Sequence, residues 1–161
     1  KQWNKRALWR LMDDKLKQKL KNYVLWLLGR QEYSRRELTF KLQQKEATDE
    51  FIENLLDWCE KHNFINEQRY CEGFVRKHIF KCHGLKRIQS EAMGKGIDRS
   101  LLERVVEELE IDWFELAQDA YNKKYSNTPA NLDYKDKAKR VRYLMYRGFS
   151  YEQIDFAMQS Q

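Results

Sequence analysis

Hydrophobic residues recur every three or four positions along most of this chain, which is the period of an α-helix with one buried face. In the first such stretch the apolar positions are Leu16, Leu20, Tyr23, Val24 and Leu27. They predict a helix that ends near Gly29, because glycine often terminates helices.

Two more helices follow within the same stretch of sequence. Ser34, with Glu37 three residues later, has the spacing of a capping box, so a second helix should begin there and bury Leu38 and Leu42. Thr48 or Asp49 should begin a third. The apolar positions of that third helix are Ile52, Leu55, Leu56 and Cys59. The three helices together make one unit.

The same pattern returns twice along the chain. Leu38 and Leu42 correspond, fifty residues later, to Ile88 and Ala92, and a third copy places Leu144 at the position of Ala92 with an offset of fifty-two. Further helix starts are expected at Asn66, Asp98 and Asp112. A period of this size is typical of repeat proteins, in which one helical unit recurs and packs on its neighbours.

The composition supports an all-α fold. The chain of 161 residues has one proline and six glycines, and it is otherwise rich in strong helix formers. We therefore predict three tandem three-helix repeats that form an elongated curved array. Their expected extents are 15–65, 66–111 and 112–161, with 1–14 as a basic N-terminal extension. A unit of about fifty residues has only marginal stability by itself, so the repeats should pack against each other.

Charge is unevenly distributed, although the net charge of +6 is modest. Residues 1–21, 69–95 and 135–147 are basic, whereas residues 46–60 and 98–110 are acidic. Basic patches of this kind can neutralise phosphates and give salt-dependent binding. The alternative is that they are solvated helix faces that balance nearby acids.

Candidate contacts to a phosphate-bearing partner lie in the middle and last repeats. They are Arg69, Arg76, Lys77, Lys81, Lys86, Arg87, Lys139, Arg140 and Arg142. Tyr33, Tyr146 and Trp9 could stack on bases, but aromatic residues in small helical units more often belong to the core.

No catalytic signature is present. Gly94-Lys95-Gly96 lacks the spacing of a phosphate-binding loop and has no preceding strand, and the histidines have no recognisable nucleophile partner. We expect a non-enzymatic protein without a cofactor. No apolar run is long enough to span a membrane, and the start lacks the apolar core of a secretory signal.

The three cysteines are odd in number and irregular in spacing, which favours a reducing, cytoplasmic setting. The helical stripe of Cys71, Phe74, Val75, His78 and Cys82 predicts buried thiols. A zinc site built from Cys59-x-x-His62 and His78-x-x-x-Cys82 is the alternative, disfavoured because closed zinc sites usually show tight Cys-x-x-Cys pairs.

Several segments together resemble one known family. The middle repeat contains Asn66-Glu-Gln-Arg69-Tyr70, Phe74-Val75-Arg76, Gly84-Leu-Lys-Arg87-Ile88 and Lys95-Gly96-Ile97. The flanking repeats contain Glu32-Tyr33-Ser34, Ile111-Asp-Trp113 and Tyr146-Arg-Gly148-Phe149. In order and spacing these segments resemble RecX, the bacterial regulator of the RecA recombinase. Two positions depart from the family pattern: Glu46 stands where Gly96 and Gly148 occur in the later repeats, and Cys82-His83 precedes Gly84 where a basic-aromatic pair is usual.

The resemblance implies binding in the helical groove of the RecA–DNA filament, and we expect the protein itself to be a monomer. The resemblance also implies inhibition of strand exchange, ATP hydrolysis and co-protease activity, and some direct affinity for single- and double-stranded DNA. Two alternatives stay open. One is a tandem helix-turn-helix DNA reader, disfavoured because the third helices of the first two repeats are acidic. The other is a scaffold that binds only proteins.

Overall fold

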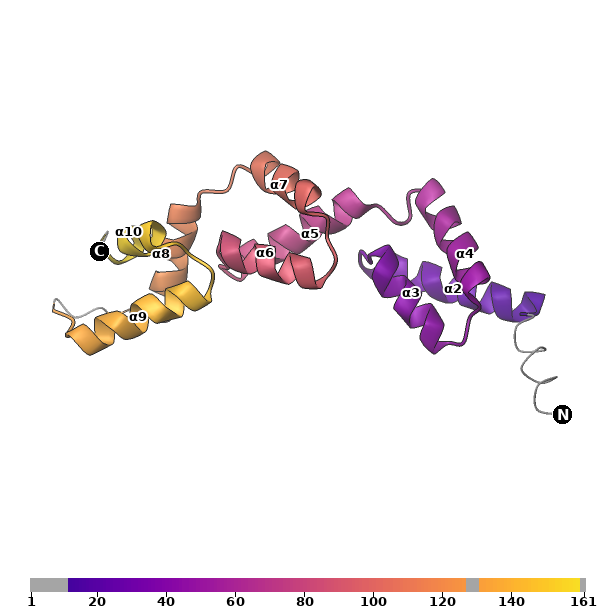
Figure 1. Ribbon diagram of the computed structural model, residues 1–161, viewed down its shortest axis with the longest axis horizontal. Helices are drawn as coiled ribbons and strands as arrows, with labels where there is room; N and C mark the ends of the chain where they lie inside the picture. Colours follow the sequence, from indigo (N-terminus) through magenta and orange to yellow (C-terminus); the bar gives the residue numbers. More distant parts are fainter. Residues whose placement is uncertain (1–11, 127–130, 160–161) are drawn as a thin grey trace. The chain divides into compact units, whose positions relative to one another are not determined.

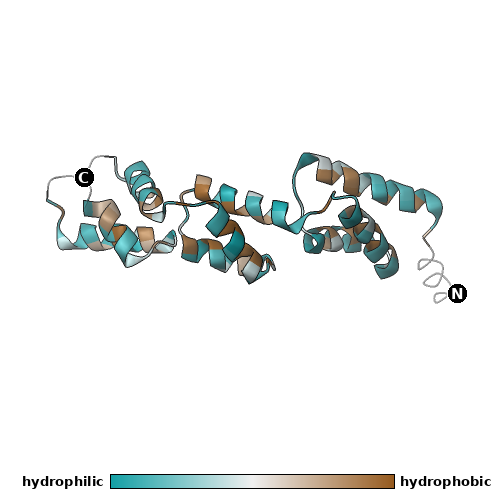
Figure 2. Cartoon of the chain, turned by 90° about the horizontal axis from the view of Figure 1, so that it is seen from above, coloured by the Kyte–Doolittle hydropathy of each residue, from teal (hydrophilic) through white to brown (hydrophobic). Residues whose placement is uncertain are grey.

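In the computed structural model, described here for residues 12–126 and 131–159, the chain contains nine α-helices and no strand (Figure 1). The all-α helical repeat fold predicted from the sequence is therefore confirmed. The helices group into two compact units, residues 1–70 and residues 71–161. Figure 2 shows hydrophobic and hydrophilic positions alternating along the helices, as amphipathic packing requires.

The first unit contains α2 (Asp14–Arg30), α3 (Arg35–Gln44) and α4 (Asp49–Lys61). Each helix begins at a side-chain cap: Asp13 for α2, Ser34 for α3 and Thr48 for α4. The predicted capping box is present, since the Glu37 N–H donates to Ser34 Oγ and the Ser34 N–H donates to Glu37 Oε1. The helix α2 ends at Arg30, one residue beyond Gly29, near which its end was predicted.

The core of the first unit lies where its three helices meet. Its buried residues are Leu20, Val24, Leu27, Leu38, Leu42, Ile52, Leu55, Leu56, Cys59 and Ile65. Leu38, Leu42 and Leu56 are fully buried, so truncating any one of them to alanine should cost about 2–5 kcal/mol. Leu16 shares the helical period but is 38% exposed, one turn before the packed part of α2.

The second unit contains six helices, the first of which begins just before residue 71. They are α5 (Glu67–Phe80), α6 (Leu85–Gly94), α7 (Arg99–Glu108), α8 (Trp113–Lys124), α9 (Tyr134–Tyr146) and α10 (Tyr151–Gln159). Three of the expected caps are in place: the side chains of Asn66, Asp98 and Asp112 each accept a backbone N–H three residues later.

Two hydrophobic clusters form the core of this unit. The first joins α5, α6 and α7 through Cys71, Val75, Ile88, Ala92, Leu101, Leu102 and Val105. The second joins α8, α9 and α10 through Leu116, Ala117, Ala120, Tyr121, Leu144, Phe149, Ile154 and Ala157. Ile79, Ile111 and Trp113 pack against both clusters. These shared residues make the second and third helical trios one packed body.

Candidate functional site

The N-terminal end of α6 meets the C-terminal end of α9 through backbone hydrogen bonds. The N–H of Gly84 donates to the carbonyl oxygen of Arg147 at 2.7 Å, and the N–H of Lys86 donates to that of Gly148 at 3.2 Å. Gly84 offers no side-chain cap. The amides at the start of a helix have no partner within the helix, and here those of Gly84 and Lys86 find acceptors in the turn that follows α9. We call this contact the α6–α9 seam.

Two glycines allow the seam to close. A Cβ atom on Gly84 would lie 2.4 Å from the carbonyl carbon of Gly148, and one on Gly148 would lie 2.6 Å from the Cβ of Arg87. Gly148 also has a φ of +101°, a conformation that side chains rarely adopt. Neither position can accept a side chain without moving backbone.

Arg147 locks the other side of the seam. Its Nε donates to the carbonyl oxygen of Cys82 at 3.2 Å, and its Nη2 donates to that of Lys81. These carbonyls follow the C-terminal end of α5, where the helix dipole favours a cation. Arg147 therefore serves the fold and is not available as a surface charge.

A shallow basic groove of about 390 Å³ runs along the seam. It is lined by Lys86, Arg87, Ser90, Glu91, Met145, Tyr146 and Gly148. The Tyr146 side chain is 75% exposed, and the Arg87 guanidinium lies 5.0 Å from the centre of its ring. A cation beside an exposed aromatic ring is a combination that can hold a phosphate and stack a base.

Glu91 orients the arginine of this groove. Arg87 Nε donates to Glu91 Oε1 at 3.1 Å, and Glu91 Oε2 lies 3.0 Å from His78 Nε2. Burial alone would raise the pKa of Glu91, but the hydrogen bond from Arg87 and the nearby His78 hold it below its ordinary value. Lys86 is exposed beside this pair, so it is the groove cation best placed to meet a ligand.

Two buried histidines adjoin the groove, since His78 contacts its lining residue Glu91. His78 Nδ1 and His83 Nδ1 are 2.7 Å apart, and both residues are almost fully buried. Burial and the charges of Arg87 and Arg147 lower the pKa of His83 to about 4, and burial likewise lowers that of His78. Both are therefore neutral at pH 7. If His78 donates from Nε2 to Glu91, its Nδ1 must accept, and His83 carries the shared proton.

Comparison with known proteins agrees with this fold. Residues 21–59 match the family model of the first three-helix domain of RecX, and residues 110–158 match that of the third. The chain is 38% identical over 138 residues to the regulatory protein RecX of Vibrio parahaemolyticus, covering 86% of this chain and 88% of the relative. It is 36% identical over 141 residues to that of Vibrio vulnificus, covering 88% and 92%.

The chain belongs to the RecX family. A crystal structure of RecX from Lactobacillus salivarius superposes with a TM-score of 0.71 at 26% identity, covering 89% of this chain and 94% of that one. A second crystal structure, of a regulatory protein RecX, gives a TM-score of 0.74 at 21% identity, covering 93% and 81%, and supports the fold alone.

In this RecX chain the basic residues predicted in the middle repeat divide into two groups. Arg76, Lys77, Lys81 and Lys86 are exposed, whereas Arg69 and Arg87 are half-buried and paired. Arg69 pairs with Glu32 and donates to the carbonyl oxygens of Asn63 and Phe64. It therefore holds the turn between α4 and α5 instead of presenting a free charge.

Arg76 lies away from the seam. It lines a second shallow groove together with Asp112, Glu115 and Asp119. Three carboxylates line the same groove as this arginine, so the groove would not attract a phosphate as the seam groove would.

The predicted residues of the last repeat also differ from one another. Lys139 and Arg142 are exposed on α9. Arg140 is half-buried, donates to the Tyr121 hydroxyl at 2.7 Å and lies 4.2 Å from the centre of the Tyr125 ring. Arg140 therefore fastens α9 to α8.

The aromatic candidates have different outcomes. Tyr33 is half-buried, with the Lys41 ammonium 5.8 Å from its ring centre, and Trp9 lies outside the described residues. Tyr146 is the exposed one, against the preference for a core position. The repeat pattern could have indicated that Tyr146 lies at the surface. Gln44 and Gly94 occupy the corresponding positions in the earlier repeats, and neither has a large apolar side chain.

The cysteines are buried free thiols, as the helical stripe predicted. Burial and the charge of Glu72 raise the pKa of Cys71 to about 11, so it is not a reactive thiolate. Within residues 12–126 and 131–159 no group of three or more His, Cys, Asp or Glu side chains could hold a metal ion. None of the helices in those ranges is both long and apolar enough to cross a membrane.

Proposed function

We propose that this RecX-family protein is a non-catalytic regulator that binds the RecA–DNA filament and uses the α6–α9 seam as its main phosphate-contacting surface. It inhibits the recombinase, ATPase and co-protease activities of the filament, and it has direct affinity for single- and double-stranded DNA. It acts in the cytoplasm as a monomer of three repeats with the extents predicted above.

One observation carries the role of the seam. Lys86, Arg87 and Tyr146 meet in a groove of about 390 Å³ whose backbone is fixed by Gly84 and Gly148. A pre-formed groove loses little conformational entropy when it binds. Lys77 and Lys81, exposed on and just beyond the last turn of α5, and Lys139 and Arg142 on α9 extend the positive charge around it.

The test is the ATPase of purified RecA on single-stranded DNA with sub-stoichiometric amounts of this protein. The wild type should inhibit, and Lys86→Glu combined with Tyr146→Ala should weaken inhibition by about tenfold, because both remove contacts that helix packing does not need. Lys95→Glu is the control, since it makes the same charge change at the other end of α6. Circular dichroism verifies that helical content is unchanged.

Inhibition that is equal for the wild type, the double variant and the control would remove the seam from the binding surface. No inhibition by the wild type, together with a footprint on one duplex sequence, would instead favour the tandem helix-turn-helix reader. That alternative is disfavoured by three exposed acids on α7, which would be repelled by the phosphates of DNA. They are Glu103, Glu107 and Glu108.

A further inference from the structure

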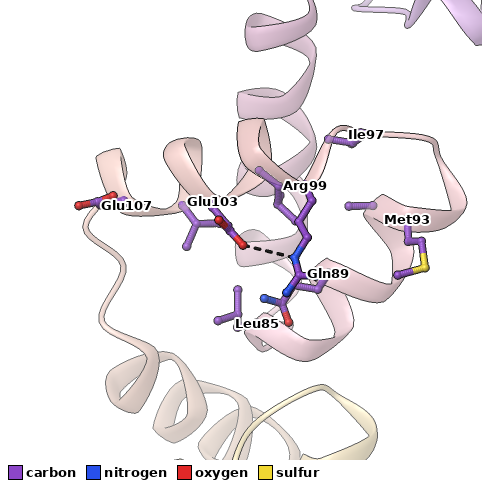
Figure 3. A pocket seen from close by; sticks show the side chains of 10 residues that line it. Leu85, Gln89, Met93, Ile97, Arg99, Glu103 and Glu107 are labelled. Carbon is purple, nitrogen blue, oxygen red and sulfur yellow. Dashed lines mark ion pairs between the residues drawn. The ribbon is translucent and has the colours of Figure 1, made fainter.

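A further groove, more apolar than the seam groove, lies between α6 and α7. It has a volume of about 430 Å³ and is lined by Leu85, Gln89, Ala92, Met93, Ile97, Arg99, Leu102, Glu103, Val106 and Glu107 (Figure 3). Met93 is 80% exposed. Its flexible thioether suits an adaptable binding surface.

The first repeat bridges the corresponding pair of helices with an arginine. Arg35 starts α3 as Leu85 starts α6, fifty residues later. Arg35 crosses to α4, where it pairs with Asp57 at 2.8 Å and Glu60 at 3.2 Å and donates to the carbonyl oxygen of Glu53 at 3.3 Å. In the first repeat an arginine of the chain itself therefore bridges the two helices.

The second repeat keeps the acids and loses the arginine. Glu103 and Glu107 stand at the positions of Glu53 and Asp57, but Leu85 replaces Arg35. Arg99 pairs with Glu103 at 3.4 Å, with both side chains well exposed (Figure 3). Such a surface pair is weak. The ion pairs of the described residues do not include Glu107.

Two further replacements make the lining of this groove apolar. Met93 stands where the first repeat has Gln43, and Ile97 stands where it has Ala47. The result is an apolar floor beside carboxylates that have no bridging arginine. An amphipathic helix that offers apolar side chains beside cations has the complementary pattern.

We propose that the α6–α7 groove is a docking site for a helical segment of a protein partner that presents leucine-type side chains with arginine one turn away. The partner's apolar side chains fill the groove beside Met93 and Val106. Its arginine takes the place that Arg35 holds in the first repeat, over Glu103 and Glu107. This site involves no DNA and does not depend on the proposed function.

The probe is an alanine-based helical peptide that carries two leucines four residues apart, each followed one turn later by arginine. Binding is measured by fluorescence anisotropy and located by the NMR methyl signals of Met93, Ile97 and Val106. Replacing the leucines by alanine, or the arginines by glutamate, should weaken binding by about tenfold.

The decisive variant is Leu85→Arg, which copies the first repeat and should close the groove from within. It should fold, because α3 begins with arginine in the same place, and it should bind the peptide about tenfold more weakly. Asn54→Arg adds the same charge on α4 and should bind like the wild type. Unchanged binding by Leu85→Arg, or methyl shifts confined to other residues, would overturn the proposal. A concentration-dependent dimer of the wild type that Leu85→Arg abolishes would assign the groove to a second copy and overturn it too.

Discussion

The N-terminal ends of α3 and α6 occupy the same position in successive repeats, yet they are capped in opposite ways. Ser34 closes α3 with its own side chain and Glu37. Gly84 has no side chain to cap α6. Instead, the carbonyl oxygens of Arg147 and Gly148 accept the N–H groups of Gly84 and Lys86. The start of α3 is thus a local structure, whereas the start of α6 exists only together with α9.

This difference matches the division of the chain into units. Among the described residues the first unit holds the trio α2, α3 and α4, whereas the second holds two trios, α5 to α7 and α8 to α10. In the first repeat Ser34 supplies the cap of α3, and its helical trio is a compact unit by itself. In the second repeat Gly84 stands at the cap of α6, and carbonyl oxygens of the third repeat accept the N–H groups of Gly84 and Lys86.

The largest expected effect comes from exchanging the two caps. Gly84→Ser gives α6 the residue that caps α3, but the new Cβ would overlap the backbone of Gly148, so it should destabilise the second unit by about 3 kcal/mol. The reverse change, Ser34→Gly, should cost the first unit only a few tenths of a kcal/mol.

Urea denaturation measures the change in the free energy of unfolding for both variants. Hydrogen exchange then measures amide protection in α6 and α3. Loss of amide protection at Lys86 and Gly148 in the first variant should accompany the loss of stability. If Gly84→Ser were neutral, a local cap could replace the shared one and the comparison would fail.

Acid should weaken the seam and spare the first unit. His83 has a pKa of about 4 in the folded protein, against an ordinary 6.5, because of burial and then of Arg87 and Arg147. The unfolded chain therefore binds a proton that the folded chain does not, and stability falls as the pH drops from 6.5 towards 4. The loss should reach on the order of 2 kcal/mol at pH 4.

The measurement is the urea midpoint of the second unit between pH 7 and pH 4, with His83→Gln as the variant that cannot titrate. The variant should show a flatter dependence over this range, whatever its stability at pH 7. A wild type as insensitive as His83→Gln would mean that the histidine pair accommodates its proton without strain.

How far the sequence could predict these features depends on the separation of the partners. The capping box at Ser34 and the caps at Asp98 and Asp112 were predictable because donor and acceptor lie within three residues. The contact of Gly84 with Gly148 joins positions more than sixty residues apart, so the pattern could indicate only that glycines end helices there.

The candidate site follows the same rule. The pairing of Arg87 with Glu91 has the i, i+4 spacing that a helix allows. The pairing of Arg140 with Tyr121 and that of Arg69 with Glu32 depend on tertiary packing. Runs of basic residues in the sequence indicate which segments carry positive charge. Only the tertiary packing distinguishes arginines that bond to other helices from lysines that face solvent.

The smallest expected effect concerns Glu46, which follows Lys45, the C-cap of α3. Glu46 has a φ of 62°, in the left-handed region that Gly96 and Gly148 occupy in the later repeats. A side chain there costs about 1 kcal/mol, and glycine removes that cost but adds freedom to the unfolded chain. Glu46→Gly should therefore stabilise the first unit by about 0.5 kcal/mol.

The reciprocal variant, Gly96→Glu, should lower the stability of the second unit by a similar amount. Thermal unfolding of Glu46→Gly and of Gly96→Glu, each against the wild type, measures the two changes. Glu46 is exposed, so its side chain loses no packing when removed. Unlike Gly148, which the neighbouring helix forces to be glycine, Glu46 has only backbone conformation at stake. A destabilised Glu46→Gly would show that glycine's freedom in the unfolded chain outweighs left-handed strain wherever no second helix presses on the turn.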